Sequence, residues 1–120
     1  MRNFRELEVW KDARTLAKEV YNTSTLLPDS EKYGLVSQIN RCAVSIPANI
    51  AEGCSKFSQK DFARFLQISL GSAFELETHL ILCEDLNFLS TETTTPIIKN
   101  IQRLQKRMVS LIKYTRHNHH

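Results

Sequence analysis

Apolar residues recur at three- and four-residue steps along most of the chain, and this spacing constrains the fold more than any other feature. Such steps keep side chains on one face of a helix with 3.6 residues per turn. The 120 residues include only three glycines and three prolines, and no Asn-Gly or Asp-Gly pair marks a hairpin between alternating apolar runs. The sequence therefore predicts an all-α protein. An apolar content of 42% suits one domain with its own core.

Four amphipathic segments follow one another and predict four helices in a single domain. Asp29 or Ser30 is expected to cap the second helix, and Ser58 the third. Thr95 is expected to cap the fourth, with Pro96 at its first position. Gly53 suits a left-handed stop after the second helix. The expected helices cover residues 7–27, 30–53, 58–87 and 95–114, followed by a polar tail over 115–120.

Pro47 stands inside the second predicted helix, where it has no N–H to donate to the carbonyl of Ala43. A bend is expected there, with Ser45 and Asn49 bonding freed backbone groups. A polar strip on the flank of this helix is expected to be partly buried. It can be a structural device alone, which is the favoured interpretation, or it can also reach a partner or ligand. Its members are Arg41, Ser45, Asn49 and Glu52.

The third predicted helix carries more apolar side chains than a bundle monomer needs, which predicts burial against another subunit. Glu77 falls within its apolar arc, where an unpaired carboxylate is costly, so a partner is expected. Arg41 is the first candidate for that partner and Asn49 the second. The surplus apolar residues are Ile68, Leu70, Phe74, Ile81 and Leu82.

Positive charge gathers at the end of the chain. Residues 93–120 carry six Lys or Arg and no acid, whereas the residues before them carry ten bases and thirteen acids. This segregation favours an anionic partner, bound through phosphates without base readout, although a solvated helix face gives the same pattern. Arg107 and Arg116 flank the proposed basic face. The candidate nucleic-acid-binding residues are Lys99, Arg103, Lys106 and Lys113 in the fourth helix, and Lys56, Lys60 and Arg64 around the start of the third.

The sequence indicates no catalytic or metal site. Cys42, Cys54 and Cys83 lack Cys-x-x-Cys spacing and are expected to be buried thiols. Glu75 and His79 stand four residues apart and could share an ion, but di-iron bundles use Glu-x-x-His twice. We expect no metal, no cofactor and no enzymatic activity. The histidines of the tail are not expected to form a site.

The first six residues form no apolar run of signal-peptide length, and no segment approaches the roughly 20 apolar residues that span a bilayer. The protein is therefore expected to be cytoplasmic, without a membrane partner.

Three runs of sequence resemble a known bacterial family. They are Leu7–Lys11, Tyr33–Arg41 and the Ser-Ile-Pro-Ala-Asn-Ile-Ala-Glu-Gly run Ser45–Gly53. Together they resemble the four-helix-bundle proteins encoded in intervening sequences of 23S rRNA genes. The resemblance implies an antiparallel, up-and-down four-helix bundle that assembles into a homopentamer. It also implies kinship with the accessory variability determinant protein of diversity-generating retroelements, which binds nucleic acid and a reverse transcriptase. It implies no settled activity, and it lends little support to the basic face of the fourth helix.

Two functional hypotheses follow. The first is a non-enzymatic, oligomeric bundle that binds RNA or DNA without sequence preference through its basic faces, because an oligomer repeats the charge of each subunit. The alternative is a protein-interaction adaptor or scaffold, for example for a reverse transcriptase, that does not bind nucleic acid itself.

Overall fold

The computed structural model describes residues 1–117 and contains four long helices and two short 3-10 turns, Phe4–Glu6 and Asp29–Glu31. No strand occurs in this part of the chain, so the all-α prediction is confirmed. The long helices are α1 (Glu8–Ser24), α2 (Leu35–Cys54), α3 (Gln59–Asp85) and α4 (Thr91–His117).

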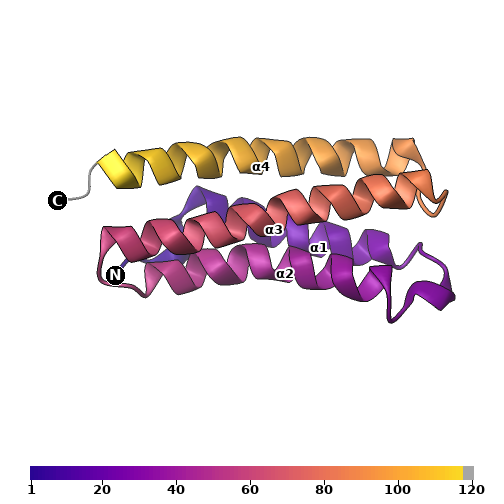
Figure 1. Ribbon diagram of the computed structural model, residues 1–120, viewed down its shortest axis with the longest axis horizontal. Coiled ribbons are helices and arrows are strands. Elements are labelled where there is room, and N and C mark those ends of the chain that lie inside the picture. The colour runs from indigo at the N-terminus through magenta and orange to yellow at the C-terminus, as the bar shows by residue number, and fades with distance from the viewer. Residues whose placement is uncertain (118–120) are drawn as a thin grey trace.

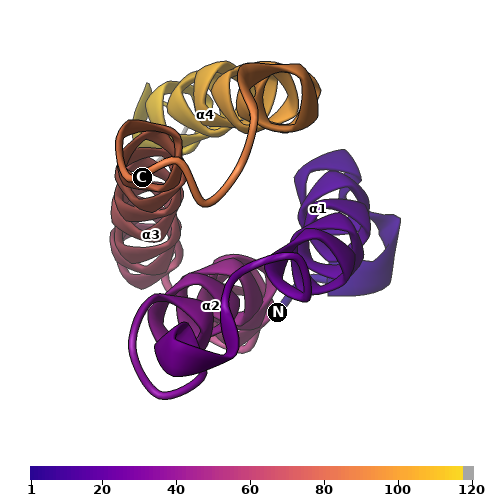
Figure 2. The same ribbon diagram turned by 90° about the vertical axis from the view of Figure 1, so that its right-hand side faces the viewer.

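The helices run alternately up and down, and both ends of the described chain lie at the same end of the molecule (Figure 1). Viewed along the bundle, each helix lies beside the one that follows it, and α4 closes the ring against α1 (Figure 2). The bundle measures 49 × 22 × 19 Å. The predicted antiparallel four-helix bundle is therefore confirmed.

Each helix contributes one apolar stripe to a single core, as the three- and four-residue spacing predicts. Packing is most extensive between α2 and α3. None of the helices over residues 1–117 is long and apolar enough to cross a membrane. The largest fully buried apolar side chains are Val20, Ile39, Ile46, Ile50, Phe62, Leu66, Leu76, Leu80, Ile101, Leu104 and Met108.

The predicted boundaries of the second helix were wrong at both ends. Asp29 and Ser30 lie in a 3-10 turn, and α2 begins only at Leu35, whose N–H donates to the Glu31 carboxylate at 3.3 Å. At the other end Gly53 is no left-handed stop, because it lies inside α2 and no described glycine has a positive φ. Gly53 is instead buried against α3.

The cap of α3 was predicted correctly, but the helix ends two residues before the predicted end at 87. Ser58 accepts the N–H of Asp61 at 3.0 Å and caps the helix. The helix ends at Asp85, and Asn87 follows with φ of 61°, the left-handed conformation that terminates many helices. The N–H of Phe88 then donates to the carbonyl of Cys83 at 2.9 Å.

Thr95 and Pro96 do not start the fourth helix. α4 begins at Thr91, and Ser90 Oγ accepts the N–H of Thr93 at 3.2 Å. Pro96 sits in the second turn, so only the carbonyl of Glu92 loses an N–H donor there. The helix continues to His117, beyond the predicted end at 114, and the remainder of the predicted tail lies outside the described residues.

Candidate nucleic-acid interface

The basic side chains of α4 project away from the core. One flank of α4 meets α3 through Gln105, and the other meets α1 through an ion pair between Arg107 and Asp12. The four predicted residues lie between these flanks and all are exposed. They span fifteen residues of helix, from Lys99 to Lys113, which is a rise of about 21 Å. These residues are Lys99, Arg103, Lys106 and Lys113, and we call them the α4 basic face.

The charge of the α4 basic face is largely free. Within residues 1–117, no ion pair joins any of its members to a carboxylate, and Arg103 has only the side-chain oxygen of Asn100 at 3.4 Å. Arg107, by contrast, is paired with Asp12. Free, exposed cations of this kind are available to an anionic partner.

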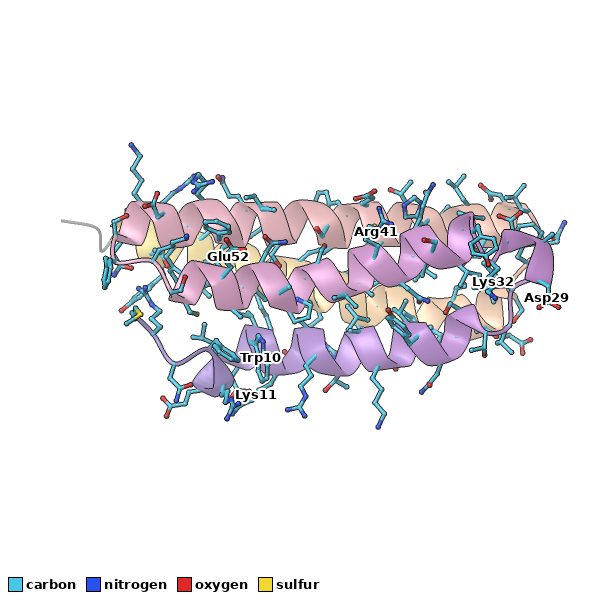
Figure 3. The ribbon with its side chains drawn as sticks, turned by 90° about the horizontal axis from the view of Figure 1, so that it is seen from below. Trp10, Lys11, Asp29, Lys32, Arg41 and Glu52 are labelled. Atoms are coloured by element: carbon cyan, nitrogen blue, oxygen red, sulfur yellow. The ribbon has the colours of Figure 1, made fainter. Side chains whose placement is uncertain are left out.

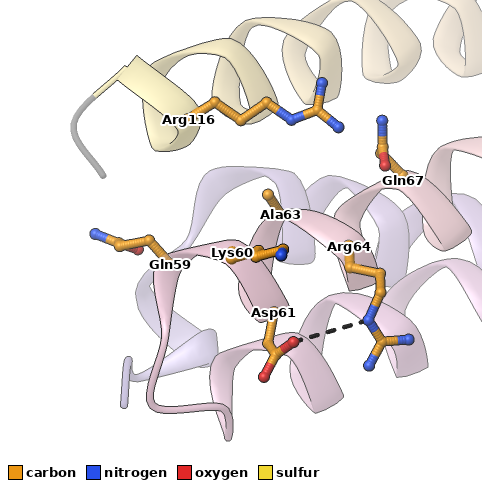
Figure 4. A pocket seen from close by; sticks show the side chains of 7 residues that line it. All are labelled: Gln59, Lys60, Asp61, Ala63, Arg64, Gln67 and Arg116. Atoms are coloured by element: carbon orange, nitrogen blue, oxygen red, sulfur yellow. Dashed lines mark ion pairs between the residues drawn. The ribbon is translucent and has the colours of Figure 1, made fainter. Parts of the chain in front are cut away.

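A second basic cluster forms where α3 begins and α4 ends. The antiparallel packing brings Arg116 beside Lys60 and Arg64, and all three line an open hollow of about 630 Å³ (Figure 4). Gln59, Gln67 and the carboxylate of Asp61 complete its polar lining. Sequence spacing places Arg116 only on the flank of α4, because its proximity to α3 depends on how the two helices pack.

Three cations were predicted around the start of α3, and we call Lys56, Lys60 and Arg64 the α3 row. Lys56 and Arg64 are partly committed to contacts within the chain. Lys56 Nζ and Arg64 Cζ lie 5.0 and 4.6 Å from the ring centroid of Phe65. Arg64 Nε also lies 3.9 Å from a carboxylate oxygen of Asp61. Lys60 has no such partner within residues 1–117. It is therefore the freest cation of this row.

The polar strip of α2 divides into a structural half and a surface half. Ser45 Oγ lies 3.0 Å from the carbonyl of Cys42, and Asn49 donates to the carbonyl of Ser45 at 2.8 Å. Both predicted side chains thus bond backbone near Pro47, although neither reaches the carbonyl of Ala43. Arg41 and Glu52 are exposed, so the expected burial of the whole strip was wrong (Figure 3).

Glu77 has its polar partners on α4, not on α2. Its carboxylate oxygens accept the side-chain N–H groups of Gln102 and Gln105 at 3.0 and 2.9 Å. Arg41 and Asn49 were therefore the wrong candidates within this chain. The prediction that Glu77 has a polar partner is confirmed.

Cys42 on α2 lies beside Glu75 and His79 on α3. One ligand atom from each residue lies within 4.8 Å of the other two, and His79 Nε2 is 3.5 Å from Glu75 Oε2. Burial of the Cys42 thiol, and then its hydrogen bond to the Glu75 carboxylate, raise its pKa to about 12. From the sequence, only Glu75 and His79 are expected to be able to share an ion. The Cys42 thiol that α2 contributes was missed.

The fold and these surfaces define an antiparallel four-helix bundle with an exposed basic face. Residues 5–110 match the family described as 23S rRNA-intervening sequence protein, and the chain belongs to this family. It is similar to the crystal structure of a protein of unknown function from the S23 ribosomal protein family of Bacteroides thetaiotaomicron. The identity is 29% and the TM-score 0.82, over 88% of this chain and 98% of that one. No curated protein matches the chain.

Proposed function

We propose that this protein binds RNA or DNA through phosphate contacts and without sequence preference. The observation that carries the proposal is the α4 basic face, four exposed cations that form no ion pair within residues 1–117. Along about 21 Å, a facing B-form duplex carries roughly a dozen phosphates. A face of this length can therefore contact several phosphates at once.

The cluster of Lys60, Arg64 and Arg116 extends the basic surface around one end of the bundle. An oligomer repeats both surfaces in every subunit, which raises the apparent affinity through several simultaneous contacts. Contacts to phosphates carry no sequence information, so base readout is not expected.

Fluorescence anisotropy with labelled duplex DNA and single-stranded RNA tests the proposal. If four phosphates are contacted on duplex DNA, the log–log slope of affinity against salt is near −0.9 per contact, or about −3.6 in all. Affinity then falls roughly 100-fold between about 50 and 200 mM salt. Duplexes of unrelated sequence bind equally.

A charge-reversal variant identifies the binding surface. Replacing Lys99, Arg103, Lys106 and Lys113 by Glu abolishes binding and leaves the fold intact, because none of these side chains lies in the core. A control variant replaces Arg5, Lys11, Arg14 and Lys18, which are exposed in α1 and in the 3-10 turn before it, by Glu. The control changes the net charge equally and retains most of the affinity. Equal losses in the two variants would reject a localised interface, and no binding by the parent at low salt would reject the proposal.

The second candidate function is a protein-interaction adaptor or scaffold, for example for a reverse transcriptase. It is supported by large apolar side chains that remain exposed on α3, including Phe74 at 55% and Ile81 at 42%. Substitution of these residues would abolish partner capture, whereas charge reversal of the α4 basic face would abolish nucleic-acid binding. The two functions are thus separable by surface.

A further inference from the structure

We propose that the seam between α2 and α3 binds one Zn²⁺ or a similar transition-metal ion through Cys42 Sγ, a Glu75 carboxylate oxygen and His79 Nε2. This site is independent of the proposed nucleic-acid interface, since none of its residues belongs to the basic surfaces.

The geometry of the three groups is close to that of bound zinc. Ligand atoms at 2.0–2.3 Å from a tetrahedral Zn²⁺ lie roughly 3.3–3.8 Å from one another. His79 Nε2 and Glu75 Oε2 already lie 3.5 Å apart, and all three ligand atoms lie within 4.8 Å of one another. The Glu75 side chain is 61% exposed and can shift to bring its carboxylate oxygen within bonding distance of the ion. The Glu75 and His79 spacing of one helical turn places both on the same side of α3.

The imidazole of His79 supplies an independent indication of a missing partner. Its side chain is only 12% exposed, and both ring nitrogens are buried without a hydrogen-bond partner within the described chain. A buried polar group without a partner is uncommon and points to an ion or water at the site. A metal ion on Nε2 would satisfy one of these two nitrogens.

The chemistry of the ligands selects the metal. Thiolate and imidazole favour Zn²⁺, Co²⁺ and related ions over Mg²⁺ or Ca²⁺, which prefer oxygen ligands. Binding transfers the thiol proton of Cys42 to solvent, so the bound ligand is the thiolate. Three protein ligands leave a fourth position for water or another donor. One turn along the same seam, Ser45 Oγ lies 2.5 Å from Ser72 Oγ, which fixes the two helices relative to each other.

Cobalt binding tests the site directly, because a cysteine thiolate on Co²⁺ gives a charge-transfer absorption that histidine and carboxylate ligands do not. The chain also carries His117, His119 and His120, so every measurement uses a background with His117→Asn, His119→Asn and His120→Asn. Titration with CoCl₂ is expected to give one Co²⁺ per chain and the thiolate band, and ZnCl₂ is expected to displace it.

Three variants and one control assign the ligands. Cys42→Ser removes the thiolate band, and His79→Gln and Glu75→Gln each weaken Co²⁺ binding by about 100-fold or more, since even outer-shell losses cost 10–100-fold. Cys83→Ser removes another buried thiol and leaves binding unchanged. Circular dichroism checks that each variant is folded. If Cys42→Ser or His79→Gln unfolds the chain, Glu75→Gln still tests the site, because Glu75 is exposed. Absence of the thiolate band in the background protein, or its persistence in Cys42→Ser, would overturn the proposal.

Discussion

Gly53 of α2 lies so close to Phe65 of α3 that a Cβ atom at position 53 would stand 2.9 Å from the Cβ of Phe65. Real Cβ atoms do not approach this closely. The carbonyl and ring of Phe62 lie 3.3 Å from the same point. The absence of a side chain at Gly53 therefore sets how closely the two helices meet, and the residue is needed for packing and not for a turn.

Gly53→Ala is expected to destabilise the protein by up to about 2 kcal/mol. Overpacking costs about 1–3 kcal/mol, and the gain in helix propensity returns about 1 kcal/mol. The Cβ of Phe65 is fixed to the backbone, so the clash is relieved only by a shift between the helices. Urea denaturation measures the change in free energy of unfolding.

Gly71→Ala is the matched control. Gly71 is also helical, but nothing lies within 4 Å of an added Cβ. Alanine is therefore expected to stabilise the protein by about 0.5–1 kcal/mol. A loss of stability here would indicate that another molecule covers this face of α3, and a gain of stability in Gly53→Ala equal to that of Gly71→Ala would contradict the close packing.

Glu77→Ala is expected to lower the free energy of unfolding by about 1–3 kcal/mol. The substitution leaves the side-chain amides of Gln102 and Gln105 without their acceptor, and hydrogen bonds to charged groups contribute about 1.5–3 kcal/mol. Chemical denaturation of the variant measures the cost. Glu77→Gln keeps one acceptor oxygen and is expected to lose less. Equal stability of the parent and Glu77→Ala would show that solvent already satisfies the carboxylate.

The sequence predicted the helices and their buried faces well, because the three- and four-residue spacing of apolar side chains follows the helical repeat in all four helices. The ends of helices were predicted less well. Thr95 and Pro96 have the features of a helix start, yet Ser90 caps α4 one turn earlier and the helix tolerates Pro96 in its second turn. Gly53 has the features of a residue that ends a helix. It lies inside α2 instead, and the close packing against α3 explains why this position holds glycine. Local chemistry permits several boundaries, and tertiary packing selects among them.

The candidate sites depend still more on packing between helices. The periodicity of α4 was enough to identify its basic face. No sequence pattern brings Arg116 to Lys60, or Cys42 to His79, because each pair joins residues of different helices. The partners of Glu77 were missed for the same reason, since the register of α4 against α3 decides which side chains face it.

The protein is expected to lose stability as the pH rises above about 9, and part of this loss is assigned to Cys83. Burial, and then the charge of Glu31, raise the pKa of the Cys83 thiol above its usual 9.0. Above that pH the unfolded chain releases the thiol proton while the folded chain retains it, so the free energy of unfolding falls. Denaturation of the parent and Cys83→Ala between about pH 8 and 10.5 is expected to show a shallower decline in the variant. Parallel declines would assign the effect to other groups.

The last prediction concerns assembly. The outer side of α3 exposes Ile68, Phe74, Ile81 and Leu82, whereas Leu70, also predicted to face a partner, packs partly against the core. Exposed apolar side chains in this number on one helix favour burial against another copy of the chain. We expect light scattering at micromolar concentration to give five times the 13.9 kDa mass of one chain.

The double variant Phe74→Ser and Ile81→Ser is expected to reduce that mass while circular dichroism stays helical, because both side chains lie outside the core. Leu26→Ser is the control, since Leu26 is 62% exposed but lies in the connection after α1, away from the apolar side of α3. The control is expected to keep the parental mass. A parent that scatters as a monomer would remove both the assembly and the added affinity that repeated basic faces provide, and binding to nucleic acid would then rest on a single α4 basic face.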